Sequence, residues 1–544
     1  MPEQRVAPSC WWARARDRCP ETCEQDSTAP RGEIQLGDPS SVRDATGVTA
    51  ESAGGVPTFV EREFRQFLGC GVWARGFARF RCDACHAERL VPFSCKARAV
   101  CPSCGGRRMA ERAAYLVDHV LPAVPMRQWV LSLPFRLRYL LAWNHELCRE
   151  VLAVYVHALR GFYRRRARRA GIADGETGAV TAIQRFGSGL NLNVHYHTLF
   201  LDGVFCRDSD GWRFVPAPPP TPCELARLVA AIARRTERLL ARRGLALGPS
   251  DADARDPLAE DAPALAALCA ASVAGRSVLG RAANARVARI GNDPDAYTPK
   301  PETPWHARYA SFDLHAGRTV RPDDRAGLER LCHYLLRAPL AQERIELLPD
   351  GRVGLTLAHP WADGTRALVF TPVEFLEKLA VLIPKPRVNL LLYHGMLAAR
   401  ARHRAVALRA MPAPTPAAPA SEVVASSSAV DAAIALPALP QVSASSVPRA
   451  SVAAGPCDTP RASPDPPPPL PRRYLAWAEL LRRIFEIDIL ACTCGGRLRF
   501  IATIDDPPVV ARILRHLGLP TETPGPAPAR PPPREPELSF DFPS

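Results

Sequence analysis

The sequence has no long hydrophobic run and no apolar stretch near its beginning. A membrane-spanning helix needs about 20 consecutive apolar residues, and no segment of the 544-residue chain approaches that length. The first residues are polar and contain no hydrophobic core of the kind that a signal peptide requires. We therefore expect a cytoplasmic protein without a membrane partner.

Acidic residues are fewer than basic ones. Lys plus Arg number 70 and Asp plus Glu number 55, which gives a net charge of +15. A basic excess favours a polyanionic partner, and nucleic acid is the commonest of these. A GC-rich genome also raises the arginine content, so composition alone leaves both explanations open.

Disulfide bonds are not expected, because cytoplasmic thiols are kept reduced. The 17 cysteines therefore indicate metal sites or buried thiols. Two Cys-x-x-Cys pairs, Cys82/Cys85 and Cys101/Cys104, are separated by 15 residues. Two such pairs can close a tetrahedral four-thiolate zinc site, which has no open position for chemistry. We expect these four cysteines to bind structural zinc.

Four other cysteines lie near this pattern or resemble it. Cys70 and Cys95 are left without a role, although Cys95 could replace one of the four ligands. Cys492 and Cys494 look like half of a zinc knuckle with one residue missing. Arginines and phenylalanines alternate around the Cys-x-x-Cys pairs, a pattern that suits a nucleic-acid-binding module.

Low-complexity segments divide the chain. Residues 405–471 are almost entirely Ala, Pro, Ser and Val, and such a segment cannot bury enough apolar surface to offset its ordering entropy. We expect a disordered extension over 1–58, a small zinc-binding domain over 59–125, a large α+β domain over 126–404, a disordered linker over 405–471, a small C-terminal module over 472–519 and a Pro-rich tail over 520–544.

A strand with two histidines is predicted within the large domain. Residues 191–201 alternate so that His195 and His197 point to one side, while Val194, Tyr196 and Thr198 point to the other. The two imidazoles are about 7 Å apart along the strand, a separation at which both can bind one metal ion. A His-x-His pair is also found among structural histidines, so the motif alone leaves both roles open.

A nucleophilic tyrosine would complete a metal-dependent site for cutting DNA. A phenolate that attacks a phosphodiester forms a 5′-phosphotyrosine and releases a 3′-hydroxyl. Tyr334 lies on a predicted helix that begins at Asp323 or Asp324 and ends before Pro339. Arg330 and Arg337 lie about one turn from it and can contact phosphates. Packing at the edge of the core is the competing role for Tyr334, and Tyr393 is the second candidate nucleophile.

Several blocks, in this order, resemble the bacterial insertion-sequence transposases of the IS91 type, which belong to the HUH endonuclease superfamily. The resemblance covers about residues 64–404 and, more weakly, 472–519. The blocks are the cysteine cluster with Phe93–Lys96, Arg108–Glu111, Arg127–Pro134, Gln184–Gly187, the histidine strand, Tyr309–Gly317, the Tyr334 helix and Leu392–Gly395.

This resemblance implies a zinc-binding domain followed by a catalytic domain with an HUH-type antiparallel sheet and helices. It implies that His195 and His197 bind Mg²⁺ or Mn²⁺ and that Tyr334 is the nucleophile. The implied function is a transposase that nicks and rejoins single-stranded DNA at the ends of a mobile element. With it we expect Arg330, Arg337, Arg107 and Arg108 to contact DNA.

The chain departs from the family pattern in two places. Founding members carry two tyrosines, whereas no second tyrosine lies three or four residues from Tyr334. Related single-tyrosine enzymes place a third metal ligand, often Gln, four residues after the tyrosine, and that position is Ala338. Gln184, Gln342 and Glu343 are all candidates for the third ligand, and the sequence does not select among them.

Two other functions are compatible with these residues. A replication initiator or relaxase would share the nicking step. A zinc-dependent DNA-binding remnant of a mobile element would lack catalysis, and the missing third ligand and the large low-complexity insertions suit such a remnant. The cysteine pairs and the order of the blocks favour the transposase.

Overall fold

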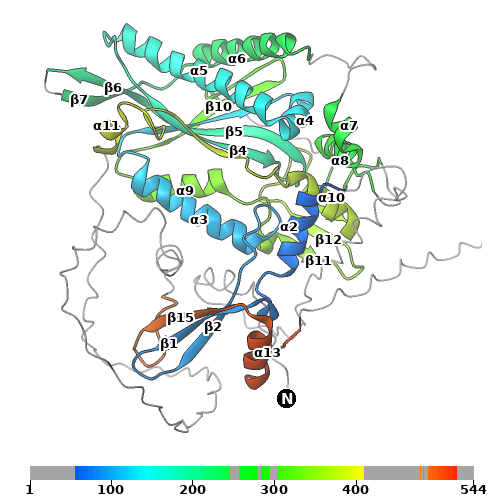
Figure 1. The fold of residues 1–544 in the computed structure, drawn as a ribbon. Coiled ribbons are helices and arrows are strands. Elements are labelled where there is room, and N and C mark those ends of the chain that lie inside the picture. Colours follow the sequence, from blue (N-terminus) through cyan, green and yellow to red (C-terminus); the bar gives the residue numbers. More distant parts are fainter. Residues whose placement is uncertain are drawn as a thin grey trace, which may run out of the picture. The chain divides into compact units, whose positions relative to one another are not determined.

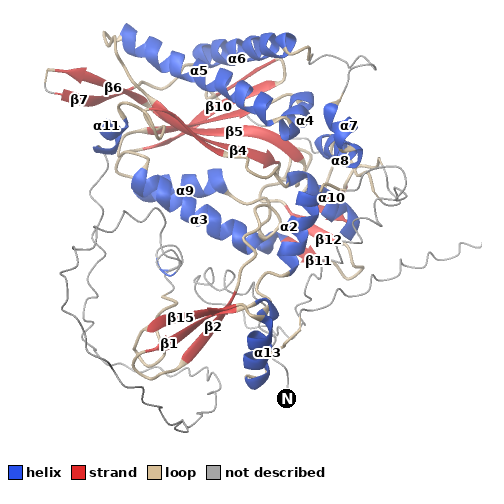
Figure 2. Cartoon of the chain, in the orientation of Figure 1, coloured by secondary structure: helices blue, strands red, loops and turns tan. Residues whose placement is uncertain are grey.

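A computed structural model describes residues 56–209, 211–245, 256–279, 284–293, 303–409 and 488–522, together with 478 and 482. Within them the fold is mixed α+β, as predicted, and all paired strands are antiparallel (Figures 1 and 2). The predicted extension, linker and tail lie almost wholly outside the described residues. No helix in the described ranges is long and apolar enough to cross a membrane.

The main sheet has six strands in the order β14-β4-β5-β3-β10-β9. They are β3 (Met126–Ser132), β4 (Gly178–Phe186), β5 (Leu192–Leu201), β9 (His306–Tyr309), β10 (Phe312–Val320) and β14 (Leu391–Gly395). β5 pairs with β4 on one side and β3 on the other. Because side chains alternate along a strand, β5 presents one set of residues to each face of the sheet.

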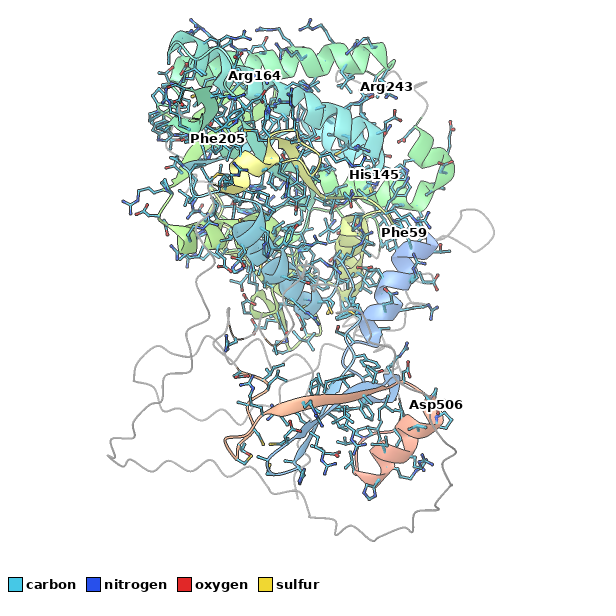
Figure 3. All side chains as sticks on the ribbon, turned by 60° about the vertical axis from the view of Figure 1, so that its left-hand side comes forward. Phe59, His145, Arg164, Phe205, Arg243 and Asp506 are labelled. Carbon is cyan, nitrogen blue, oxygen red and sulfur yellow. The ribbon has the colours of Figure 1, made fainter. Side chains whose placement is uncertain are left out.

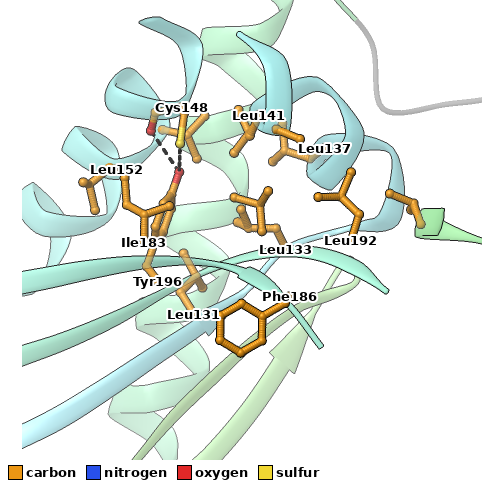
Figure 4. Packing of buried hydrophobic residues seen from close by; sticks show 14 of the residues in the cluster. Leu131, Leu133, Leu137, Leu141, Cys148, Leu152, Ile183, Phe186, Leu192 and Tyr196 are labelled. Atoms are coloured by element: carbon orange, nitrogen blue, oxygen red, sulfur yellow. Dashed lines mark hydrogen bonds between the residues drawn. The ribbon is translucent and has the colours of Figure 1, made fainter. Parts of the chain in front are cut away.

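Three helices cover one face of this sheet (Figure 1). They are α4 (Phe135–Trp143), α5 (His145–Arg169) and α6 (Pro222–Arg242). Tyr196 and Phe200 of β5 pack here beside Trp129 of β3. The Tyr196 hydroxyl donates a hydrogen bond of 2.9 Å to the carbonyl of Cys148 on α5 (Figure 4). The even-numbered residues of β5 therefore belong to this core.

Two helices, α3 (Pro102–His119) and α9 (Arg325–Leu336), cover the opposite face. Leu199 of β5 shares a buried cluster with Leu116 of α3 and with Leu331 and Leu335 of α9. The two helices also contact each other, and Arg325 of α9 donates a hydrogen bond to the carbonyl of Val117 in α3. The odd-numbered residues of β5, including both histidines, therefore face α3 and α9.

α9 begins where the sequence predicts. Asp324 is its N-cap, and its carboxylate accepts a hydrogen bond of 2.7 Å from the backbone N–H of Gly327. Leu328, Leu331 and Leu335 form the buried stripe. The helix ends at Leu336, three residues before Pro339. This leaves Tyr334 in the last turn.

Smaller elements surround the main sheet. A four-stranded sheet has the order β11-β12-β13-β8, and β6 pairs with β7 as a hairpin. The bounds are β6 (Gly203–Asp208), β7 (Gly211–Pro216), α7 (Pro257–Asp261), α8 (Pro263–Val273), β8 (Ala288–Ile290), η3 (Gln342–Arg344), β11 (Ile345–Leu347), β12 (Val353–Thr356), β13 (Ala367–Phe370), α10 (Pro372–Leu382) and α11 (Arg404–Arg409).

A third sheet joins the two ends of the described chain. Its order is β15-β1-β2, with β1 (Phe77–Cys82), β2 (Glu88–Pro92) and β15 (Leu498–Ile504). Helices α2 (Thr58–Leu68) and η1 (Trp73–Arg75) precede the β1–β2 hairpin, and α13 (Pro507–His516) follows β15. The segments predicted as a zinc-binding domain and as a separate C-terminal module thus share one sheet.

Candidate active site and cysteine clusters

β5 carries the two histidines side by side on its α9-facing side. Their ring centroids are 4.8 Å apart, and His195 and His197 are 7% and 3% exposed. On β4, Gln184 lies directly opposite His195 in the strand register. The predicted alternation is confirmed, and it places two imidazoles and one carboxamide on the same patch of the sheet.

Hydrogen bonds orient both rings through Nδ1. His195 Nδ1 lies 2.8 Å from the carbonyl oxygen of Asn193, and His197 Nδ1 lies 3.0 Å from the Gln128 amide. His197 Nε2 is buried without a hydrogen-bond partner in the described part of the chain. In a metal-binding histidine one ring nitrogen usually donates its hydrogen to a neighbouring acceptor and leaves the other free for the ion. His195 has this arrangement toward the Asn193 carbonyl, and His197 takes it when the Gln128 side-chain oxygen, rather than its nitrogen, faces Nδ1.

Both imidazoles are neutral at neutral pH. Burial, together with the positive charges of Arg337 and Arg138, lowers the pKa of His195 to about 4. The pKa of His197 lies well below its ordinary value, because the ring is buried and because charge on the neighbouring His195 and Arg337 disfavours its protonation. The neutral imidazole is the form that binds metal ions.

Tyr334 reaches this patch from α9. Its ring is 5.5 Å from that of His197, in an edge-to-face arrangement. The Arg337 guanidinium lies 4.7 Å from the centre of the Tyr334 ring. Tyr334 is 39% exposed, so a large substrate can reach it. The fold thus joins the predicted tyrosine to the predicted histidines.

Tyr393, the second candidate, lies on β14 opposite Val180 of β4. It packs against the apolar cluster that includes Leu199 and Leu331. Its position suits a role in packing between the sheet and the helices.

Gln184 connects β4 to α9 beside the histidines. Its amide nitrogen donates to the backbone carbonyls of Leu335, at 2.8 Å, and Tyr334, at 3.2 Å. Its side-chain oxygen is buried and has no hydrogen-bond partner within the described ranges. Gln342 and Glu343, the remaining candidates for a third ligand, are exposed in η3. Of the three, Gln184 is the one that shares the sheet face with both histidines.

The four arginines that we expect to contact DNA differ in their surroundings. Arg337 lies over Tyr334 and also contacts the Phe186 ring, at 5.5 Å. Arg330 has a side chain that is 73% exposed. Arg108 donates a hydrogen bond of 2.7 Å to the carbonyl of Lys96, which suits a role in holding the cysteine loop. Arg107 lies beside it on α3.

The predicted zinc set is not brought together. Cys101 and Cys104 lie with Cys70 and Cys95, and all four sulfurs are within 4.8 Å of one another. Cys95 Sγ lies 3.5 Å from Cys104 Sγ, and Cys101 Sγ lies 3.7 Å from Cys70 Sγ. Hydrogen bonds from the neighbouring thiols lower the pKa of Cys104. Four mutually close sulfurs suit tetrahedral zinc.

Cys82 and Cys85 belong to a second cluster, with Cys492 and Cys494. The expectation that both Cys-x-x-Cys pairs form one site is therefore corrected. Cys82 ends β1 and Cys85 lies in the turn to β2, whereas Cys101 is the N-cap of α3. Spacing indicates that each pair can hold a metal, but it does not show which other sulfurs the fold brings to it.

Comparison with protein families gives two matches. Residues 178–405 match the family described as "Putative transposase", and residues 44–133 match the family described as "Transposase zinc-binding domain". Comparison with curated proteins and with solved structures gives no match. The first matched region contains the histidines, Gln184 and Tyr334. The second contains six of the eight clustered cysteines, and Cys492 and Cys494 lie outside both regions.

Proposed function

Because this chain belongs to the IS91-type transposases and carries their zinc-binding domain, we propose that it nicks and rejoins single-stranded DNA at the ends of its element. The single observation that carries this proposal is the contact between Tyr334 and His197, whose rings lie 5.5 Å apart. It joins an accessible phenol to a pair of neutral imidazoles. These are the parts that a tyrosine-dependent, metal-assisted nicking site needs.

His195, His197 and Gln184 are the residues that would hold a divalent cation, Mg²⁺ or Mn²⁺. The fit rests on buried atoms, since His197 Nε2 and Gln184 Oε1 lack partners among the described residues. An unsatisfied buried polar group costs about 1–3 kcal/mol, and a metal ligand role accounts for that cost. A bound cation would polarise a non-bridging oxygen of the scissile phosphate and stabilise the charge of the displacement.

The proposed step is an in-line displacement by Tyr334. The phenol oxygen bonds to phosphorus, and its proton passes to solvent. The bond between phosphorus and the 3′-oxygen breaks, and that oxygen takes up a proton as the free 3′-hydroxyl. The 5′-phosphate stays on Tyr334, so the reverse step rejoins DNA without another energy source. Arg337, over the Tyr334 ring, would hold the phosphate near the hydroxyl.

Structural zinc would fix α3 beneath this site. The cluster of Cys70, Cys95, Cys101 and Cys104 lies at the N-terminus of α3. A Cβ atom at Gly105 would lie 2.7 Å from the Ala338 Cβ, so this turn of α3 closely approaches the segment after α9. Zinc at this cluster would therefore keep α3 in contact with the helix that carries Tyr334.

The proposal is tested with single-stranded oligonucleotides from both ends of the element. The protein is incubated with each one and Mn²⁺ or Mg²⁺, and the mixture is separated on a denaturing gel. We expect a covalent protein–DNA adduct and a free 3′-hydroxyl on the released strand. No adduct with any end would favour a non-catalytic remnant. Nicking confined to a plasmid origin would favour a replication initiator or relaxase.

Removing the Gln184 oxygen should weaken metal dependence more than it weakens the fold. We expect Gln184→Ala to raise the Mn²⁺ concentration needed for half-maximal nicking by about 10-fold or more. Gln184→Glu keeps an oxygen at the same place and should bind Mn²⁺ at least as well as wild type. The measurement is a Mn²⁺ titration of nicking at fixed DNA.

A different result would reassign Gln184. If Gln184→Ala has the wild-type Mn²⁺ dependence, the residue serves only as the link between β4 and the backbone of α9. Gln342→Ala, at an exposed position in η3, is the matched control and should leave the titration unchanged.

A further inference from the structure

The segment 488–522 adds a strand to the N-terminal sheet. β15 pairs with β1 in antiparallel register from Phe77 opposite Ile504 to Cys82 opposite Leu498. The Arg89 side chain of β2 also donates a hydrogen bond of 3.0 Å to the carbonyl of Ile489, 400 positions away in sequence. Distant parts of the chain are therefore neighbours in this sheet.

Two cysteine pairs meet at one end of this pairing. Cys82 Sγ is 3.5 Å from Cys494 Sγ, and Cys85 Sγ is 3.6 Å from Cys492 Sγ. All four sulfurs lie within 4.8 Å of one another. Zinc held by thiolates at about 2.3 Å in a tetrahedron separates the sulfurs by about 3.8 Å. The observed separations match that geometry.

The loop between the two C-terminal cysteines and β15 is shaped around these sulfurs. Gly495 has a φ of +83°, which favours glycine, and the backbone N–H of Cys492 donates to the carbonyl of Gly496 at 2.9 Å. A Cβ atom at Gly496 would lie 2.9 Å from Cys82 Sγ and 3.3 Å from Cys494 Sγ. The N–H of Gly496 also points at Cys494 Sγ, at 3.4 Å. A backbone that approaches sulfurs and donates to them is typical of a zinc knuckle.

The apolar core beneath this sheet is small. Its fully buried members are Phe77 of β1 and Val510 and Leu514 of α13. α13 begins after Asp506, which is labelled in Figure 3. Domains of this size commonly need a metal or a disulfide in addition to their core. The four cysteines are free thiols rather than disulfides, so a metal ion is the fitting addition.

We propose that Cys82, Cys85, Cys492 and Cys494 bind a second structural zinc ion, which fastens the C-terminal segment 488–522 to the N-terminal sheet. Cys492 and Cys494 lie outside both regions that match known families, so the site combines family residues with residues from a distant part of the chain. Such a link would join two segments that flank the region of the main sheet in the sequence. This proposal is independent of whether Tyr334 nicks DNA.

The zinc content of the purified full-length protein tests the site. We expect Cys492→Ser/Cys494→Ser to contain one zinc ion fewer per chain than wild type, and Cys101→Ser/Cys104→Ser also to contain one fewer. Cys223→Ser, at an exposed cysteine of α6, is the matched control and should lose none. The proposal is overturned if Cys492→Ser/Cys494→Ser keeps the wild-type zinc content.

A second measurement does not depend on how well these variants fold. A specific protease site is inserted between residues 411 and 474 of the otherwise wild-type chain, and the cut protein is passed over a size-exclusion column. We expect the C-terminal fragment to elute with the rest of the chain and to separate from it after treatment with a zinc chelator. Separation without the chelator, or continued co-elution of the metal-free fragments, would contradict a zinc link.

Cobalt distinguishes the two clusters by their spectra. Co²⁺-substituted Cys101→Ser/Cys104→Ser should still show the absorption of tetrahedral Co²⁺ bound to thiolates, because Cys82, Cys85, Cys492 and Cys494 remain. Adding Cys492→Ser/Cys494→Ser should remove that absorption. The second site would be overturned if Cys101→Ser/Cys104→Ser is folded, as judged by circular dichroism, and still lacks the absorption of thiolate-bound Co²⁺.

Discussion

Replacing either His195 or His197 with alanine should abolish the nicking of single-stranded DNA and leave the zinc content unchanged. Both rings are buried and neutral and face α9, and both lie on the strand at the centre of the proposed site. Loss of one ligand removes the charge stabilisation that a bound cation gives to the displacement. We expect the rate to fall by about 1,000-fold or more.

The measurement is single-turnover nicking in Mn²⁺, beside the zinc content of the same samples. His157→Ala is the matched control, because His157 is exposed on α5, on the other side of the sheet, and should nick at the wild-type rate. If His195→Ala and His197→Ala nick at wild-type rates, the two histidines are structural residues of β5. If zinc is lost as well, the result would reflect damage to the fold.

Tyr334→Phe should abolish the covalent adduct while the protein still binds DNA. Phenylalanine keeps the ring that contacts His197 and Arg337 and removes only the hydroxyl. Because that hydroxyl is the proposed nucleophile, nicking should fall by about 1,000-fold or more. Adduct formation on a denaturing gel and DNA affinity in a filter-binding assay measure the two properties separately.

Tyr393→Phe is the control for this variant. Tyr393 lies on β14 and packs in the apolar cluster, so its replacement should leave adduct formation intact. An adduct that persists in Tyr334→Phe and disappears in Tyr393→Phe would transfer the nucleophile to β14. An adduct that persists in both would place the nucleophile on a residue other than these two tyrosines.

The geometry of the paired imidazoles can be predicted from the sequence because it is local. A period of two puts residues 195 and 197 on one side of any strand. The Tyr334 helix is equally predictable, since Asp324 caps it and its leucines have helical spacing. Neither pattern reveals that β5 and α9 pack together. Only the resemblance to the transposases leads to that expectation.

The partner of each cysteine pair cannot be predicted in the same way. Cys-x-x-Cys spacing indicates a knuckle, but the partner of a knuckle depends on tertiary structure. Cys70 follows α2 and Cys95 follows the β1–β2 hairpin, so only the tertiary structure brings them to Cys101 and Cys104. Cys492 and Cys494 reach Cys82 and Cys85 only through the pairing of β15 with β1. Contacts at this sequence separation leave no periodic pattern.

Gln184 illustrates why a third ligand cannot be chosen from the sequence. It precedes His195 by 11 residues, and only the register of β4 against β5 places the two opposite each other. The position four residues after the tyrosine, where related single-tyrosine enzymes carry the third ligand, is Ala338, which packs close to Gly105 of α3. Among the described residues the buried Gln184 oxygen has no hydrogen-bond partner, which supports its proposed role, and only the folded site reveals this.

The central claim, that Tyr334 cuts DNA and keeps its 5′ end, is tested most directly by locating the covalent bond. The wild-type adduct formed with an end oligonucleotide is digested with a nuclease and a protease, and the DNA-linked peptide is sequenced by mass spectrometry. We predict a nucleotide attached through its 5′-phosphate to Tyr334. Attachment to any other residue, or through a 3′-phosphate, would contradict the claim.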